Sequence, residues 1–247
     1  GGSMIKLNLV LVCFFYVVFN AHSGEVIALD SSYPPYMHLA KGKVQGLYPR
    51  LLDEVFQKMK VDVKLEPKPW ARVMRMAKRG KWGVGGIYKN SERLKIFDYS
   101  DPIYQEKLLL FVKNSSQIKF SSLKDLKGKV LALMRGWSYG TEFDKEKKRK
   151  SFRVIETGDG VQSFTLLLKG RVDGVVMDGV SAKMILEKNN WIGKVKEQTT
   201  PVARNASYIA FHKTMKKTAV IESFNKALLQ IKEEGSYDKI ISNFVKE

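Results

Sequence analysis

The stretch Gly85-Gly86-Ile87-Tyr88-Lys89-Asn90-Ser91-Glu92-Arg93, followed by Phe97-Asp98-Tyr99-Ser100-Asp101-Pro102, decides the fold that we expect for this chain. The apolar run 84–88 is typical of the end of a buried strand, and Asn90 is a good N-cap for a helix with Arg93 in its first turn. The free N–H groups at such a helix start attract anions, and an arginine adds a planar fork that suits a carboxylate. The alternative is an exposed Arg93 that pairs with Glu92 or Asp98.

The first 23 residues have the pattern of a processed leader. Gly1-Gly2-Ser3 before Met4 looks like a cloning remnant, Lys6 and the apolar run 7–19 form a signal-peptide pattern, and Ala21-His22-Ser23 is a small-x-small cleavage site. We therefore expect a remnant and signal peptide over 1–23 and export to the periplasm. The alternative is an N-terminal membrane anchor, for which the run is short.

Composition bounds the rest of the chain. At 247 residues and 44% hydrophobic content, the chain can bury one large core or two smaller ones. The only cysteine, Cys13, lies in the leader, so the mature chain from about Gly24 must be held together by core packing.

The charge of the chain favours anionic ligands. Lysine and arginine number 43 against 25 acidic residues, a formal net charge of +18. The dense run 145–150 contains no aromatic residues, so we interpret it as a solvated helix face and predict no nucleic-acid partner. His22, His38 and His212 are scattered, and no metal spacing or catalytic triad is visible, so we predict no metal and no cofactor.

Periodicity predicts an α/β chain with two lobes. The expected strands are 26–29, 61–65, 84–88, 104–112, 130–134, 152–155, 174–177 and 208–211. The expected helices are 51–59, 69–79, a short one at 123–129, one around 161–168, and a C-terminal pair at 221–231 and 240–244. Asp178 then stands at the carboxyl end of a strand, where ligands bind in open α/β sheets.

Taken together, several motifs resemble the bacterial extracellular solute-binding proteins of the polar-amino-acid family, the periplasmic receptors of ABC importers. The resemblance covers essentially all of the mature chain. It is carried by Tyr33-Pro34-Pro35-Tyr36, Pro69-Trp70-Ala71-Arg72, Ser91-Glu92-Arg93 with Asp98-Tyr99-Ser100-Asp101-Pro102, Leu123-x-x-Leu126-x-Gly128-Lys129, Gly170-Arg171-Val172-Asp173 and Asp178.

The resemblance implies a two-lobed, type II periplasmic-binding-protein-like fold with hinge crossings at 103–107 and 212–214. Lobe 1 would comprise 24–106 plus 213–247, and lobe 2 would comprise 107–212. In that family the residue at the position of Arg93 grips the ligand α-carboxylate, and the residue at the position of Asp178 binds the α-ammonium. The implied function is capture of a small carboxylate-bearing solute, an amino acid or relative, by a monomer that presents it to an ABC permease in the inner membrane.

The sequence departs from the family at two places. Gly80-Lys81-Trp82-Gly83 lacks the Asp that members carry before the third strand, and Tyr88 stands where amino-acid binders often have a small hydroxyl. We expect Tyr33, Tyr36 and Trp70 to form an aromatic wall, with ordinary core packing of at least one of them as the alternative. Arg72 is either a second anion contact or a surface residue. The full set of predicted ligand-binding residues is Asp30, Tyr33, Tyr36, Trp70, Arg72, Gly86, Tyr88, Arg93, Trp137, Ser138 and Asp178.

Two other functions remain open at this point. The family resembles periplasmic dehydratases that act on arogenate or prephenate, and such an enzyme would need an acid or base among Asp30, Glu92 and Asp178. The third possibility is a sensor whose closed form contacts a membrane kinase.

Overall fold

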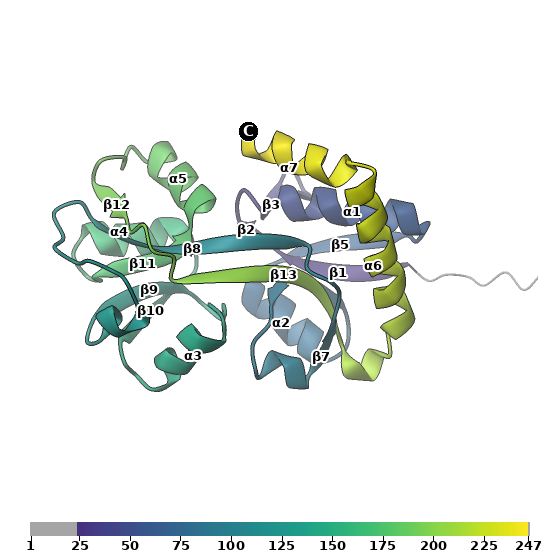
Figure 1. Ribbon diagram of the computed structural model, residues 1–247, viewed down its shortest axis with the longest axis horizontal. Coiled ribbons are helices and arrows are strands. Elements are labelled where there is room, and N and C mark those ends of the chain that lie inside the picture. Colours follow the sequence, from purple (N-terminus) through teal and green to yellow (C-terminus); the bar gives the residue numbers. More distant parts are fainter. Residues whose placement is uncertain (1–23, 247) are drawn as a thin grey trace, which may run out of the picture.

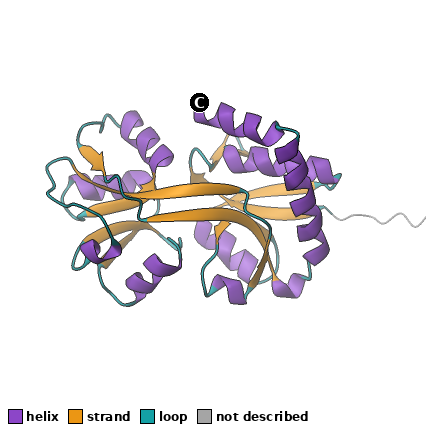
Figure 2. Cartoon of the chain, in the orientation of Figure 1, coloured by secondary structure: helices purple, strands orange, loops and turns teal. Residues whose placement is uncertain are grey.

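Two antiparallel strands, β8 (Tyr104–Lys113) and β13 (Ala203–His212), run between two lobes in the computed structural model, which describes residues 24–246 (Figure 1). The predicted remnant and signal peptide lie outside the described residues. Both strands belong to one sheet with the order β10-β9-β11-β8-β13-β6-β1-β5. The lobes are therefore two ends of one continuous sheet (Figure 2).

The first lobe contains a parallel set of strands with β1 (Glu25–Asp30) between β5 (Val63–Lys68) and β6 (Gly83–Tyr88). A small antiparallel sheet lies beside them and consists of β2 (Ser32–Tyr33), β3 (Met37–Ala40) and β4 (Lys43–Gln45). The helices of this lobe are α1 (Leu47–Met59), α2 (Trp70–Lys78), α6 (Thr218–Glu233) and α7 (Ser236–Lys246).

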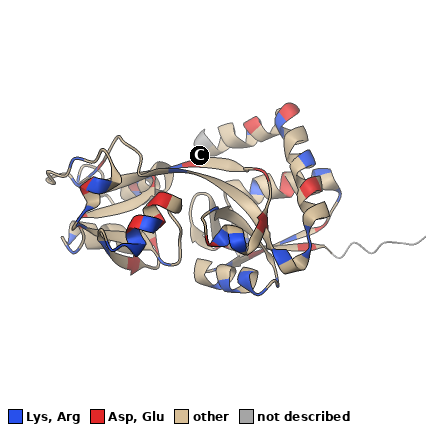
Figure 3. Ribbon diagram, turned by 60° about the horizontal axis from the view of Figure 1, so that its bottom comes forward, with Lys and Arg blue, Asp and Glu red and all other residues tan. Residues whose placement is uncertain are grey.

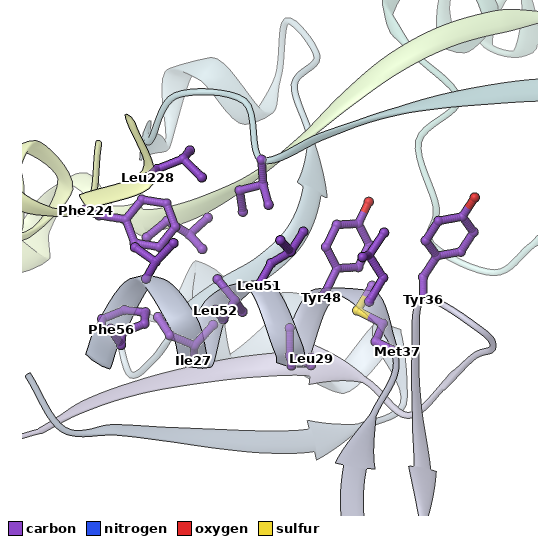
Figure 4. Close-up of a cluster of buried hydrophobic side chains, with 14 of the residues drawn as sticks. Ile27, Leu29, Tyr36, Met37, Tyr48, Leu51, Leu52, Phe56, Phe224 and Leu228 are labelled. Atoms are coloured by element: carbon purple, nitrogen blue, oxygen red, sulfur yellow. The ribbon is translucent and has the colours of Figure 1, made fainter. Parts of the chain in front are cut away.

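Alternating residues of β1 explain how these helices cover both faces of the sheet. Ile27 and Leu29 pack in one apolar cluster with α1 and α6, whereas Ala28 packs in another with α2. In the first cluster the rings of Phe56 and Phe224 lie 5.7 Å apart (Figure 4). The C-terminal helices thus return to the first lobe and complete its core.

The second lobe repeats the strand and helix alternation. Its strands are β9 (Val130–Met134), β10 (Arg153–Thr157), β11 (Gly174–Asp178) and β12 (Val195–Glu197), and its helices are α3 (Thr141–Lys148), α4 (Gly160–Leu168) and α5 (Gly179–Lys188). Asp178 ends β11 and caps α5, since its Oδ1 accepts a hydrogen bond from the Ser181 backbone N–H at 2.8 Å. The short helix expected at 123–129 is a 3₁₀ turn, Leu123–Leu126.

Strand β13 is longer than the sequence predicts. Residues 203–207 pair with 104–108 of β8, residues 207–210 pair with β6, and residues 210–212 pair with β7 (Phe97–Tyr99). The apolar run 208–211 marks only the buried end of this strand, so its first half, with mostly polar or small side chains, was not predicted.

The helix expected after Asn90 is a single 3₁₀ turn, Arg93–Lys95. The Asn90 side chain does accept from the Arg93 backbone N–H at 2.8 Å, as an N-cap would. The chain cannot continue as a helix because Phe97 must begin β7 and pair with His212. The prediction of a helix dipole at Arg93 is therefore wrong, and the environment of its side chain has to come from other groups.

Residues 145–148 of the basic run lie in helix α3, residues 149 and 150 follow its end, and the run makes ion pairs on the surface. Lys147 Nζ lies 3.1 Å from a carboxylate oxygen of Glu156, and Lys148 pairs with Glu92 across the lobes. Figure 3 shows basic and acidic residues interspersed on both lobes. Within residues 24–246, no helix is long and apolar enough to cross a membrane.

We predict that Phe224→Ala lowers the free energy of unfolding by about 3–5 kcal/mol, because a fully buried ring is lost and a cavity remains. Denaturant unfolding measures this. Leu229→Ala on the same helix is the control, since Leu229 is 56% exposed and its loss should cost less than about 0.5 kcal/mol. Equal losses in the two variants would contradict the packing described for α6.

Candidate ligand-binding site

A small pocket with about 20 Å³ of free space lies between the lobes. Its lining residues are Asp30, Tyr33, Met37, Trp70, Gly86, Tyr88, Arg93, Trp137 and Ser138. Only Trp137 and Ser138 come from the second lobe, on the loop between β9 and α3. This space is enough for about one water molecule, so a larger solute needs the lobes or the lining side chains to move apart.

Arg93 supplies a buried cation to this pocket. Its guanidinium donates to the carbonyl oxygens of Tyr88 (3.0 Å) and Gly136 (3.4 Å) and lies 5.7 Å from the ring of Trp70. Burial lowers the pKa of Arg93, but a guanidinium remains charged at neutral pH. No carboxylate in the described part of the chain forms a salt bridge with it. A cation buried without an ion-pair partner favours an anionic ligand.

Asp30 supplies an opposite charge from the end of β1. The residue is fully buried, and one carboxylate oxygen accepts from the backbone N–H (2.9 Å) and hydroxyl (2.8 Å) of Ser32. The other oxygen accepts from the indole N–H of Trp137 at 3.3 Å. Burial raises the pKa of the Asp30 carboxyl, and these hydrogen bonds oppose the shift. The pocket therefore presents a cation and a carboxyl group to one ligand.

Aromatic rings form much of the wall between these charges. The Tyr33 ring packs edge-on against Trp137 at 4.4 Å and is stacked on Tyr36 at 5.0 Å. The Trp70 indole N–H donates to the Gly136 carbonyl at 3.0 Å, so its position is fixed by the second lobe. Flat apolar surfaces of this kind suit the hydrocarbon part of a solute.

The lobes contact one another at the pocket rim. The Asn90 side-chain amide donates to the Ser138 hydroxyl (3.0 Å) and to an Asp144 carboxylate oxygen (3.1 Å). Ser138 in turn donates to the same Asp144 oxygen at 2.5 Å. The residue that caps the turn carrying Arg93 thus also touches the second lobe.

A second acidic group lies behind the pocket wall. The Glu106 carboxylate, on β8, accepts hydrogen bonds from the hydroxyls of Tyr33, Tyr48 and Tyr88. The Tyr33 hydroxyl is also 2.9 Å from Oδ2 of Asp178. In Figure 4 the hydroxyl of Tyr48 points out of the apolar cluster. Tyr33 and Tyr88 therefore connect the pocket to two carboxyl groups.

Eight of the eleven predicted ligand-binding residues line the pocket, and three do not. Tyr36 is 2% exposed and packs in the first-lobe core, as in the alternative to the aromatic wall. Arg72 is exposed on α2, because two residues after Trp70 a helical side chain points to the other side. Asp178 is buried behind Tyr33.

Sequence reasoning missed Met37 and Glu106. Met37 follows the proline loop with no pattern that marks it. Glu106 did carry a signal: alternation along the strand puts it on the same face as the buried Leu108 and Leu110. A glutamate on the buried face of an otherwise apolar strand indicates a functional or paired carboxyl group.

Two α/β lobes joined by two strands, with a charged pocket between them, define the class of type II periplasmic binding proteins. The chain belongs to the bacterial extracellular solute-binding proteins, family 3, whose model matches residues 26–247. The family and fold expected from the motifs are thereby confirmed.

Individual relatives are distant but cover most of the chain. An arginine-binding periplasmic protein of Mannheimia haemolytica is 22% identical over 95% of this chain and 97% of its own length. The L-cystine-binding protein TcyJ of Escherichia coli is 22% identical over 85% of this chain and 78% of its own.

Solved structures show the same fold. An ancestral arginine-binding protein bound to arginine superposes with a TM-score of 0.75 at 28% identity, over 90% of this chain and 97% of the other. A histidine kinase sensor domain reaches a TM-score of 0.80 at 20% identity, over 90% of this chain and 96% of its own.

We predict that Gly86→Ala destabilises the protein and deforms the pocket. Gly86 has φ +72°, and an added Cβ would lie 2.7 Å from the methyl group of Met37. The left-handed conformation alone costs an alanine about 1–2 kcal/mol, and overpacking adds about 1–3 kcal/mol. Gly193→Ala isolates the first cost, since Gly193 has φ +80° and nothing within 4 Å of its added Cβ. Denaturant unfolding that gave the same loss for both variants would contradict the close approach at Gly86.

Proposed function

We propose that this protein captures an amino acid with a cationic side chain in the periplasm and presents it to an ABC permease. The observation that carries the proposal is Arg93, which is buried at the pocket without a carboxylate partner among residues 24–246, with the buried carboxyl group of Asp30 in the same pocket. Together with Asp178 behind Tyr33, these groups complement an amino acid that carries one carboxylate and two cations. The printed names of the arginine-binding relatives support this ligand class.

In this proposal each charged group binds one part of the ligand. Arg93 binds the α-carboxylate through its guanidinium. Asp178 binds the α-ammonium once the Tyr33 hydroxyl turns aside, and Asp30 binds the side-chain cation. Trp70, Tyr33, Tyr88 and Trp137 enclose the hydrocarbon part between the charges.

Lobe closure would couple binding to transport. We keep the first hinge at 103–107 and move the second from 212–214 to 203–207, because β13 pairs with first-lobe strands from Ser207 onward. In the described part of the chain, the paired segments 104–108 and 203–207 are then the only part of the sheet between the lobes, and lobe 2 would span about 108–203.

We propose binding rather than catalysis. Of the three acid–base candidates, Glu92 is exposed and paired with Lys148, and Asp178 is covered by Tyr33, so Asp30 alone lines the pocket. General acid–base chemistry on a bound solute usually needs a positioned proton donor or acceptor at the reacting atoms. Membership of a family of solute-binding proteins also supports binding over catalysis.

The location and partners are also proposals. A periplasmic monomer exported by the signal peptide and read by an inner-membrane permease agrees with the family's extracellular solute-binding role. The sensor alternative has a structural relative in the histidine kinase sensor domain, which at 20% identity shows a shared fold. Copurification from membranes with a permease or with a kinase would separate the two.

We predict that Arg93→Ala weakens binding of L-arginine by about 2–5 kcal/mol, since a charged hydrogen-bond partner of the carboxylate is lost. Titration calorimetry measures the change. Arg72→Ala removes the same charge from the exposed side of α2 and should bind as the unmodified protein does. Equal affinity in the two variants would refute the role of Arg93.

We also predict that L-arginine makes the protein more compact in small-angle scattering. A ligand held by both lobes stabilises the closed state through its differential affinity for that state. Asp178→Asn should weaken both affinity and compaction. A protein that binds L-arginine tightly with an unchanged scattering profile would rule out closure as the signal.

A further inference from the structure

Glu106 occupies an unusual place for a glutamate. It lies on crossing strand β8, is 1% exposed, and receives hydroxyl groups from three first-lobe elements: Tyr33 from β2, Tyr48 from α1 and Tyr88 from β6. Two of these tyrosines line the ligand pocket. The carboxylate therefore holds part of the pocket wall from behind.

If both Glu106 and Asp178 were ionised, this cluster would have too few protons to make all of its contacts hydrogen bonds. Four oxygen–oxygen contacts join Glu106 and Asp178 to Tyr33, Tyr48 and Tyr88, but these three phenols supply only three protons. The Tyr36 hydroxyl adds one contact and one proton at Asp178, so the shortage of one proton remains. The Tyr33 hydroxyl touches both carboxyl groups and can donate to only one. All four contacts become hydrogen bonds when one carboxyl group carries a proton and donates it to the Tyr33 oxygen.

The groups that face Glu106 offer no positive charge that could replace this proton. They are Asp178 from β11, Tyr104 on β8 itself, Ser207 from β13, and the tyrosines 33, 36, 48 and 88. Among residues 24–246 neither carboxyl group forms an ion pair with a lysine, arginine or histidine. Burial, and then the charge of Asp178, raise the pKa of Glu106 to about 7, and burial also raises the pKa of Asp178.

We propose that Glu106 and Asp178 share one proton in the ligand-free protein, and that the α-ammonium of a bound amino acid takes its place. When the ammonium binds Asp178, Tyr33 donates to Glu106 alone, and an ionised Glu106 then accepts from all three tyrosines. The proton leaves to solvent, so charge balances: one ligand cation replaces one proton. Glu106 is in this sense a positioning residue that acts on the ligand through Tyr33 and Tyr88.

The second half of this inference rests on the proposed function, but the shared proton can be tested without any ligand. A carboxyl group with a raised pKa in the folded state binds more protons than its unfolded counterpart, whose pKa is about 4.3. Folding stability should therefore fall as pH rises from about 5 to about 8.

The ligand-free experiment is thermal unfolding across this pH range. Glu106→Gln should flatten the fall in melting temperature, and Asp178→Asn should do the same, because removing either charge removes the need for the proton. Glu222→Gln makes the same charge change at an exposed site on α6 and should keep the slope of the unmodified protein. A slope unchanged in both Glu106→Gln and Asp178→Asn would overturn the shared proton. The two variants together keep the test valid if one of them does not fold.

The second experiment is calorimetry with L-arginine in buffers of different ionisation enthalpy. At pH 6 binding should release about one proton, and affinity should rise up to about tenfold per pH unit toward pH 7, because a reaction that releases a proton is favoured by higher pH. Glu106→Gln should bind with no proton release and a flat pH profile. Binding without proton release in the unmodified protein would overturn the displacement. If L-arginine does not bind at all, the ligand class is wrong, and the unfolding experiment still decides on the shared proton.

Discussion

The pairing of 104–108 with 203–207 is the constraint on which the rest of the structure depends. Within residues 24–246 these two short segments are the only strand pairing that joins the lobes, and from it β8 continues into the second lobe and β13 into the first. In the proposed closure, a rotation of one lobe would be absorbed in about five residues of each strand. Side chains at this crossing lie between the lobes. Glu106 can therefore contact the first-lobe tyrosines although its strand continues into the second lobe.

Buried charge without a partner is the second organising feature. Asp30, Arg93, Glu106 and Asp178 are all less than 10% exposed, and none forms a salt bridge in the described part of the chain. Such groups destabilise a fold unless hydrogen bonds or a counter-charge compensate them. If these residues served only to pack the core, apolar residues could take their places with little loss of stability. Their presence together around one pocket is what a receptor for a zwitterion requires, because the compensating charges arrive with the ligand.

The sequence was sufficient for the fold and for much of the site, for reasons that are local. Alternation and helical spacing identified the elements, and Arg93 was found because Asn90 and the preceding strand define a corner. The prediction of a helix after that corner is wrong because Phe97 pairs with His212, a long-range contact that no local pattern shows. The same limit applies to the start of β13 at Ala203. Arg72 shows the reverse case, where a plausible residue beside Trp70 lies on the outer side of its helix. Glu106 could have been found by alternation alone, but its three tyrosine partners come from segments between 18 and 73 residues away.

Contacts between the lobes also contribute to ligand affinity in a two-lobed receptor. The contacts of Trp70 with Gly136, of Asn90 with Ser138 and of Trp137 with Asp30 exist only when the lobes are together. Each of them favours the closed state before any solute binds. The apparent affinity of the receptor equals the intrinsic affinity of the closed pocket multiplied by the fraction of molecules that are closed. Stronger contacts at the rim would therefore raise affinity, but they would also close the empty receptor and weaken the signal that distinguishes it from the loaded one. The unpaired charges oppose that outcome, since an empty closed pocket leaves Arg93 and Asp30 buried without counter-charge. The balance between rim contacts that favour closure and buried charges that disfavour it makes closure depend on the solute.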